Sequence, residues 1–186
     1  MKNIAIFASG NGTNAQAILD HLSGASYARV AVIVVNKPEA YVIRRAEQHN
    51  IPVVLISRKT TPSALLNILR EYSIDFIVLA GYLALIPPEI TQQYTRQIIN
   101  LHPALLPNFG GKGMFGEHVH EAVLDARASY SGITIHYVDE QYDTGAPILQ
   151  ASCPVLPDDT PDTLAERIHT LEHRYLPFVI DLLLNS

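Results

Sequence analysis

The stretch Asn100–Pro107, NLHPALLP, follows the short apolar run QII at 97–99, and we predict a strand over 97–101. Residues i and i+2 of a strand point the same way, so the Asn100 amide and the His102 imidazole lie on one side. The two prolines that follow cannot continue a ladder of hydrogen bonds. Such a pair at a strand end can polarise a carbonyl group. The alternative is that both side chains only secure the turn, which is common turn chemistry.

Upstream of this stretch, apolar runs alternate with amphipathic segments. We expect strands at 3–8, 29–35, 53–56 and 75–80, and helices at 14–22, 41–49, 62–71 and shortly after 88. Strands that alternate with helices of this length predict βαβ units. They also predict a parallel sheet that is covered by helices on both faces.

Downstream, the pattern changes. The segment 108–116, NFGGKGMFG, contains four glycines and is predicted to be a loop, followed by a helix at 117–126. Strands at 132–138 and 148–155 are expected to pair antiparallel. A long helix should begin after Thr160, a good N-cap, and Pro177 should kink or divide it. Its buried stripe is expected to consist of Leu164, Ile168, Leu171 and Tyr175.

The expected fold is therefore α/β. We predict a Rossmann-like three-layer α/β/α arrangement, with a mostly parallel twisted sheet and an antiparallel C-terminal strand pair. No linker, repeat or low-complexity segment interrupts the sequence, so we expect a single domain over 1–186.

Composition narrows the function. Of 186 residues, 48% are hydrophobic and 17% charged, as in ordinary globular proteins, and the net charge of -5 argues against a nucleic-acid partner. No apolar run approaches the ~20 residues of a membrane span, and no signal peptide begins the chain, so we expect a cytoplasmic protein with no membrane partner. The single cysteine, Cys153, lies in an apolar run and is expected to be a buried, inert thiol.

Ligands of open α/β sheets bind at the carboxyl ends of the parallel strands. The loop Ser9–Asn14, SGNGTN, lies between the first strand and its helix and suits a phosphate group. Gly10, Gly12 and Ala15 also fit a relaxed dinucleotide pattern, but that reading needs an acidic residue after the second strand, where the sequence is VNK at 35–37. A tight turn without a ligand is the third interpretation.

Two further strand ends carry unusual residues. The apolar segment 79–87, LAGYLALIP, is suited to line a pocket for a flat heteroaromatic ligand, although such segments are more often core. The acidic segment 139–145, DEQYDTG, is either a solvated loop or the source of a positioned carboxylate. Asp143 is the candidate, and it would complete a set of amide, imidazole and carboxylate with Asn100 and His102.

The loop 9–14, the block 100–107 and the block DTGAPILQ at 143–150 together resemble those of phosphoribosylglycinamide formyltransferases, nearly end to end. The resemblance implies the formyltransferase fold, with a phosphate-binding half at about 1–100 and a folate-binding and catalytic half at about 101–186. It also implies formyl transfer from 10-formyltetrahydrofolate, as co-substrate, to the amine of glycinamide ribonucleotide in purine biosynthesis. No metal is needed. A monomer or homodimer is expected.

The same resemblance implies roles for particular residues. Asn100, His102 and Asp143 would be catalytic, with a protonated His102 that Asp143 keeps charged. Glu172 would meet the ribose or glycinamide end of the substrate. The phosphate would be held by Gly12, Thr13 and Asn14. The folate would be flanked by Leu83, Ala84, Leu85, Ile86, Val138, Asp139, Glu140, Gln141 and Tyr142.

The sequence departs from the family pattern in two places. The loop 108–116 is several residues longer than usual, and Ala84 stands where many members have arginine. The rival functions are a formyltetrahydrofolate hydrolase, another formyltransferase such as the methionyl-tRNA enzyme, and a nucleotide- or folate-binding module without catalysis. His118 and His120 are two residues apart on a predicted helix and do not face each other, so they are poor co-ligands of a metal. His136 is expected to be a hydrogen-bonded core histidine that supports the site.

Overall fold

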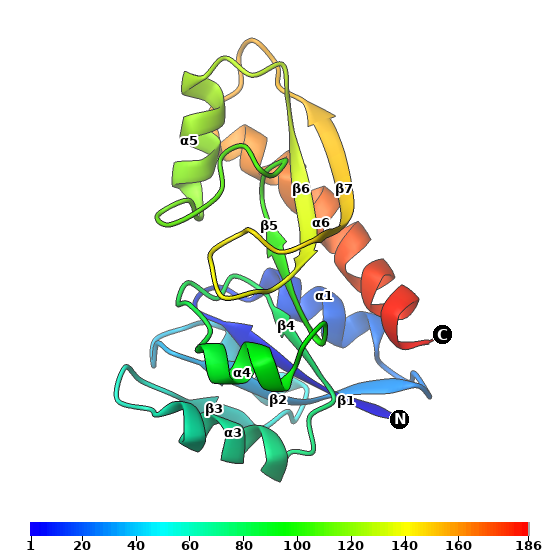
Figure 1. The fold of residues 1–186 in the computed structure, drawn as a ribbon. Helices are drawn as coiled ribbons and strands as arrows, with labels where there is room; N and C mark the ends of the chain where they lie inside the picture. The colour runs from blue at the N-terminus through cyan, green and yellow to red at the C-terminus, as the bar shows by residue number, and fades with distance from the viewer. Residues whose placement is uncertain (186) are drawn as a thin grey trace.

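Seven strands form one sheet in the order β3-β2-β1-β4-β5-β6-β7 (Figure 1). The computed structural model describes residues 1–185. The strands are β1 (Lys2–Ala8), β2 (Ala28–Val35), β3 (Val53–Leu55), β4 (Phe76–Leu79), β5 (Ile98–His102), β6 (Tyr130–Tyr137) and β7 (Pro147–Pro154). The first five pair in parallel, whereas β6 is antiparallel to both β5 and β7, so the predicted fold class is confirmed.

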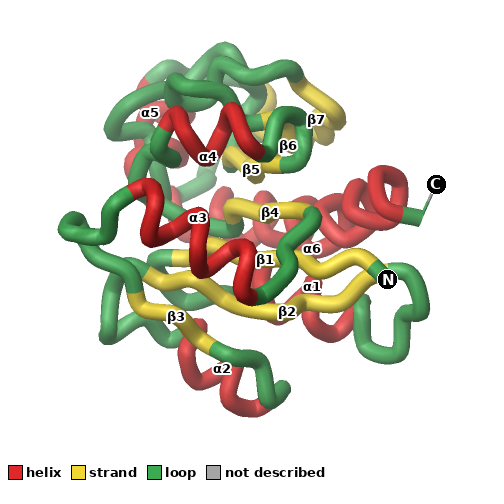
Figure 2. The backbone as a smooth tube through the Cα atoms, turned by 60° about the horizontal axis from the view of Figure 1, so that its bottom comes forward, coloured by secondary structure: helices red, strands yellow, loops and turns green. Residues whose placement is uncertain are grey.

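Helices cover both faces of the sheet (Figure 2). The helices are α1 (Thr13–His21), α2 (Val42–Gln48), α3 (Pro62–Glu71), α4 (Pro88–Gln93), α5 (Glu117–Asp125) and α6 (Pro161–Leu184). Helices α3 and α4 pack on one face and α1, α2, α5 and α6 on the other, so the molecule has two separate apolar cores. Within residues 1–185, no helix is long and apolar enough to cross a membrane.

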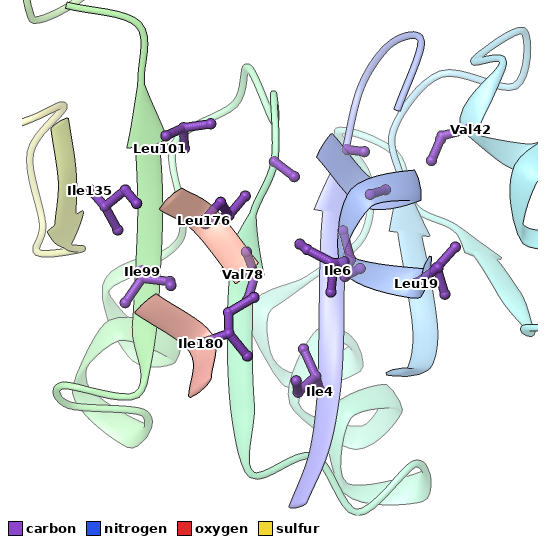
Figure 3. Packing of buried hydrophobic residues seen from close by; sticks show 14 of the residues in the cluster. Ile4, Ile6, Leu19, Val42, Val78, Ile99, Leu101, Ile135, Leu176 and Ile180 are labelled. Carbon is purple, nitrogen blue, oxygen red and sulfur yellow. The ribbon is translucent and has the colours of Figure 1, made fainter. Parts of the chain in front are cut away.

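The larger core lies between the sheet and α1 and α6. Figure 3 shows Leu176 and Ile180 of α6 beside Val78 of β4, and all three side chains are fully buried. Strands buried on both faces read as continuous apolar runs, which is why the alternating pattern of amphipathic strands is missing from most of this sequence.

The structure corrects two predictions for α6. The buried stripe continues from Ile168 through Glu172 to Leu176, whereas Leu171 and Tyr175 are only half-buried at its border. The sequence pattern missed this because a carboxylate interrupts the apolar i, i+4 row.

Pro177 does not divide the helix, which runs unbroken over 24 residues. A proline inside a helix removes its own hydrogen bond to residue i−4, and its ring crowds the carbonyl of that residue, so packing must offset the cost. Its ring is buried, and apolar neighbours on the same face keep the helix against the sheet.

Candidate active site

A cavity of about 650 Å³ opens at the carboxyl ends of β1, β4 and β5. Its position follows from the topology, because the chain passes from β1 to one side of the sheet through β2 and β3 and then returns to the other side at β4. The two directions of winding leave a crevice between β1 and β4, where ligands of α/β proteins bind. All three strand ends singled out in the sequence contribute to its walls.

The loop Ser9–Asn14 forms the first wall. Gly12 is the N-cap of α1 with φ 77°, and a Cβ there would lie 2.4 Å from Cγ2 of Val42, so only glycine fits. The hydroxyl of Ser9 accepts a hydrogen bond from the amide of Leu83 at 3.1 Å, which ties this loop to the one after β4. The residues at the start of α1 therefore line the cavity from a fixed position, and a helix N-terminus is suited to bind a phosphate group.

Two basic residues that the sequence did not assign lie at this loop. Arg45 of α2 donates to the carbonyl oxygen of Asn11 at 2.9 Å and to its side-chain oxygen at 2.7 Å, which holds the loop in place. Lys37 lines the cavity at the end of β2, where a dinucleotide site would carry an acidic residue. A cation there favours a phosphate group over ribose hydroxyls. No sequence motif marks Arg45, because its contact depends on how α2 packs.

The block Asn100–Pro107 ends β5 and turns sharply. Thr134 of β6 is fully buried, and its hydroxyl donates to the carbonyl of Ala104 at 2.7 Å and accepts from the amide of Leu106 at 3.0 Å. Strand β5 ends at His102, one residue beyond the predicted end. Asn100 and His102 therefore both lie within β5, and their side chains point to the same side.

Asn100 and His136 are direct cross-strand partners. The Asn100 amide nitrogen lies 3.1 Å from His136 Nε2 and donates to Asp143 Oδ1 at 3.3 Å. His136 Nδ1 lies 2.8 Å from the carbonyl of Tyr137, so Nδ1 carries the proton and Nε2 accepts from Asn100. The predicted supporting role of His136 is confirmed.

His102 is buried, with each ring nitrogen beside an oxygen. Nε2 lies 2.8 Å from the carbonyl of Phe109, and Nδ1 lies 3.5 Å from Asp143 Oδ2. Burial lowers the pKa of His102, and the raising effects of Asp143 and the Phe109 carbonyl only partly offset it. Desolvation therefore opposes the charged form of His102 that the sequence led us to expect, and it outweighs the neighbouring carboxylate in the direction of the pKa shift.

Asp143 shows the opposite balance. Burial alone would raise its pKa, but the His136 and His102 rings and the amide of Gly111, which donates to Oδ2 at 2.9 Å, lower the pKa overall. Asp143 has a left-handed backbone with φ 58°, a conformation that aspartate tolerates better than most residues. The neighbours of Asp143 thus favour its ionised form.

The apolar wall consists of residues from two loops. All four residues of Leu83–Ile86 line the cavity, as do Val138, Gln141 and Tyr142. Asp139 and Glu140 do not line it. Asp139 accepts from the Thr144 hydroxyl at 2.7 Å and Glu140 from the Gln92 side chain at 3.1 Å, so these two acids shape the loop from outside.

Glu172 closes the end of the cavity near the phosphate loop. Although it is only 4% exposed, it accepts from Asn14 at 2.9 Å and lies 2.8 Å from His169 Nδ1. Burial alone would raise the pKa of Glu172, but these two neighbours lower it overall, and the hydrogen bond to Glu172 raises the pKa of His169. His120 also lines this end and is buried, which its place between apolar positions of α5 would have indicated.

Across residues 1–185, no group of three or more histidine, cysteine or acidic side chains is arranged to hold a metal ion. His118 is exposed beside Glu121, whereas His120 is buried, so the two histidines face different surroundings.

The cavity thus joins a glycine-rich loop at the start of a helix, an apolar wall and an amide–imidazole–carboxylate set in an α/β fold. Residues 2–180 match the family model described as formyl transferase, and the chain belongs to that family.

Within this family, the chain is similar to phosphoribosylglycinamide formyltransferases. It is 41% identical to the one from Bacillus subtilis, over 99% of this chain and 95% of that protein. The glycinamide ribonucleotide transformylase 1 structure from Geobacillus kaustophilus has a TM-score of 0.89 and 42% identity, covering 99% of each chain.

Plant relatives are longer. The chloroplastic phosphoribosylglycinamide formyltransferase of Arabidopsis thaliana is 43% identical over 93% of this chain. The chain spans 62% of the length of that protein and 61% of the Vigna unguiculata relative.

Proposed function

We propose that the protein transfers the formyl group of 10-formyltetrahydrofolate to the amine of glycinamide ribonucleotide. The products are formylglycinamide ribonucleotide and tetrahydrofolate, in the de novo synthesis of purines. The observation that carries the proposal is that one cavity joins the phosphate loop, the apolar wall and the contacting residues Asn100, His102 and Asp143. A cavity of about 650 Å³ has the size of typical small-molecule sites.

The two ends of the cavity suit the two substrates. The amides of Gly12, Thr13 and Asn14 would bind the phosphate of the ribonucleotide, with Lys37 and Glu172 nearby. The folate ring would lie against Leu83–Ile86, Val138, Gln141 and Tyr142. The reacting amine and formyl carbon would then meet beside Asn100, His102 and Asp143, and positioning of the two substrates accounts for much of the rate.

Asn100 would stabilise the negative charge that develops on the formyl oxygen, and His102 would add its positive charge once it has accepted a proton. The amine nitrogen bonds to the formyl carbon, and the carbonyl electrons move to oxygen. The Asn100 amide would donate to the formyl oxygen the hydrogen that it now donates to Asp143. That hydrogen bond, at 3.3 Å, is the longer of the two that the amide makes. One such donor is typically worth about 3–4 kcal/mol in the transition state.

His102 and Asp143 would carry the proton. A neutral imidazole accepts the proton that the attacking amine must lose, and Asp143 stabilises the resulting imidazolium through Nδ1. The bond from the formyl carbon to the folate nitrogen then breaks, and the same proton goes to that nitrogen. Nδ1 is the reacting ring atom, because Nε2 is engaged by the Phe109 carbonyl.

The test is an assay of 10-formyltetrahydrofolate turnover with and without glycinamide ribonucleotide, with the product identified by mass spectrometry. Turnover that requires the ribonucleotide and yields its formylated form supports the proposal. Turnover without the ribonucleotide would identify a hydrolase instead. Saturable binding of either ligand without turnover would identify a binding module. The cytoplasmic location, the single domain and the monomer or homodimer expected from the sequence stay predictions.

A further inference from the structure

The loop 108–116 reaches both members of the imidazole–carboxylate pair through its main chain. The carbonyl of Phe109 lies 2.8 Å from His102 Nε2, and the amide of Gly111 donates to Asp143 Oδ2 at 2.9 Å. The sequence showed only that this loop is long and rich in glycine. We propose that Phe109 and Gly111 are positioning residues of the active site, whose main-chain groups fix the orientation and ionisation of His102 and Asp143. This inference rests on the proposed function of that pair.

The loop is held against the site by its own packing. The Phe109 side chain packs against the larger apolar core, and its backbone adopts φ 55°, which non-glycine residues rarely do. A Cβ on Gly110 would lie 2.4 Å from Cδ2 of Leu106 and 3.4 Å from Cβ of Asp143, so the backbone passes close to the carboxylate. Gly111 follows with φ 95°. A strained conformation persists only where the surroundings impose it.

The two contacts act in the same electrostatic direction. A carbonyl oxygen on Nε2 stabilises the protonated imidazole, and an amide N–H on Oδ2 stabilises the ionised carboxylate. The Phe109 carbonyl also fixes the tautomer, because a neutral His102 must then carry its proton on Nε2 and present Nδ1 to Asp143. The loop therefore favours the ion pair of a protonated His102 and an ionised Asp143, which burial disfavours.

Other charged groups also face this pair. His136 on β6 lies 3.5 Å from Asp143 Oδ1, while Glu172 on α6 raises the pKa of His102. On α5, His120 is the neighbouring titratable group. A test must leave all of these unchanged and remove only the loop contact.

Gly111→Ala and Gly113→Ala form a matched pair. Both glycines lie in this loop with left-handed φ values, 95° and 89°, and neither has an atom within 4 Å of an added Cβ. Alanine strains the backbone similarly at both, but only the amide of Gly111 contacts Asp143. We expect the acid limb of the kcat/KM profile to move up by about one pH unit in Gly111→Ala, because the strained backbone draws the amide away from Oδ2. Loss of a donor raises the pKa of the carboxylate and strengthens its attraction for the His102 proton. The Gly113→Ala profile should match that of the unsubstituted protein. Equal shifts in both variants, or none in Gly111→Ala, would overturn the proposal.

A second measurement needs neither turnover nor a loop variant. In the unsubstituted protein, the proton shift of the Gly111 amide should titrate with Asp143 at acid pH, and this titration should vanish in Asp143→Asn. The ring nitrogen shifts of neutral His102 should report a proton on Nε2. A Gly111 amide that does not titrate, or a proton on Nδ1, would refute the positioning role even in an active enzyme. If the amide titrates but no formyl group is transferred, the proposed function fails and the contact stands.

Discussion

Three buried ionisable side chains show how local partners decide charge. Asp143 and Glu172 each lie beside an N–H donor, and their pKa values fall below the ordinary value despite burial. His102 has a carbonyl and a carboxylate as neighbours, yet desolvation still lowers its pKa. Short hydrogen bonds to a carboxylate outweigh burial here, whereas a charge at 3.5 Å does not. Both shifts thus favour a carboxylate beside an uncharged imidazole.

Asp143→Asn should lower kcat/KM by about 10²–10⁴-fold, the usual contribution of a proton-transferring group. An amide can hold the geometry but cannot stabilise the imidazolium. Because a neutral His102 is the proposed base, activity of the unsubstituted protein should fall as the pH drops through the lowered pKa of His102. The acid limb of the variant should lie at lower pH, because the carboxylate that raises the pKa of His102 is gone. The measurement is the pH profile of formyl transfer.

Asp125→Asn, an exposed site at the end of α5, is the control and should change nothing. Full activity of Asp143→Asn would remove the carboxylate from the mechanism.

At the scale of the elements, the loops at the strand ends line the cavity, and the helices keep these loops in place. Gly12 is the N-cap of α1, Val42 begins α2, and the two are in contact, so the loop Ser9–Asn14 is fixed by the packing of the two helices. Helix α6 contributes Glu172 from its buried face, which connects the C-terminal helix to the same loop through Asn14.

Gly12→Ala should raise the KM for glycinamide ribonucleotide about tenfold or more with a small change in kcat, because lost phosphate contacts affect ground state and transition state alike. The added methyl group meets Val42, so the loop must shift. Gly24→Ala is the matched control, with φ 80° and open space around the added Cβ. Each substitution should cost about 1–2 kcal/mol of stability from the left-handed backbone, and only the first should change KM. Equal KM values would contradict the phosphate assignment.

The start of α6 is fixed by an ion pair. Arg167 donates to both oxygens of Asp159 at 2.7 and 2.9 Å, and this hydrogen bonding lowers the pKa of Asp159 far below its usual value. The contribution is therefore complete above the unfolded pKa of about 3.9 and is lost as the pH falls through the folded value.

Arg167→Gln should lower the free energy of unfolding by about 1–3 kcal/mol at pH 7, with a smaller difference below pH 3. Urea unfolding at both pH values measures it. Arg70→Gln, at an exposed site whose only side-chain hydrogen bond is long at 3.5 Å, is the control. A difference that grows as the pH falls would contradict the ion-pair explanation.

At the scale of the whole molecule, one sheet carries two cores and one active site. Ile99 lies in β5 between Ile98 and Asn100, faces the larger core and is fully buried. Neighbouring residues of β5 thus have different roles. Ile98 and Ile99 anchor the strand by packing into the two cores, whereas Asn100 and His102 are held in place at its rigid end. Rigid strands position side chains more accurately than loops do.

Ile99→Ala should lower the free energy of unfolding by about 2–5 kcal/mol, and Ile99→Val by about 0.5–1.5 kcal/mol, because a cavity costs more than a lost methyl group. Denaturant unfolding measures both. Losses of equal size would indicate that the core collapses around the gap.

The sequence predicted the element order and the fold class well, because alternating strands and helices leave few topologies for a parallel sheet. It also predicted the residues that meet at the strand ends, since the carboxyl ends of parallel strands share one edge. It failed where a contact depends on packing. No local pattern in the sequence marks the contact of Arg45 with Asn11 or the burial of Glu172 in the stripe of α6. The two main-chain contacts of the loop 108–116 have no local pattern either.

The sequence by itself determined the layers, the parallel and antiparallel parts of the sheet and the identity of the amide, imidazole and carboxylate. Periodicity and turn residues act over a few positions, so they can be read from a single chain. Only the tertiary structure decided the charge state of that set. The pKa of His102 depends on burial and on atoms from Phe109, Asp143 and Glu172, which lie 7, 41 and 70 positions away along the chain and meet only after folding.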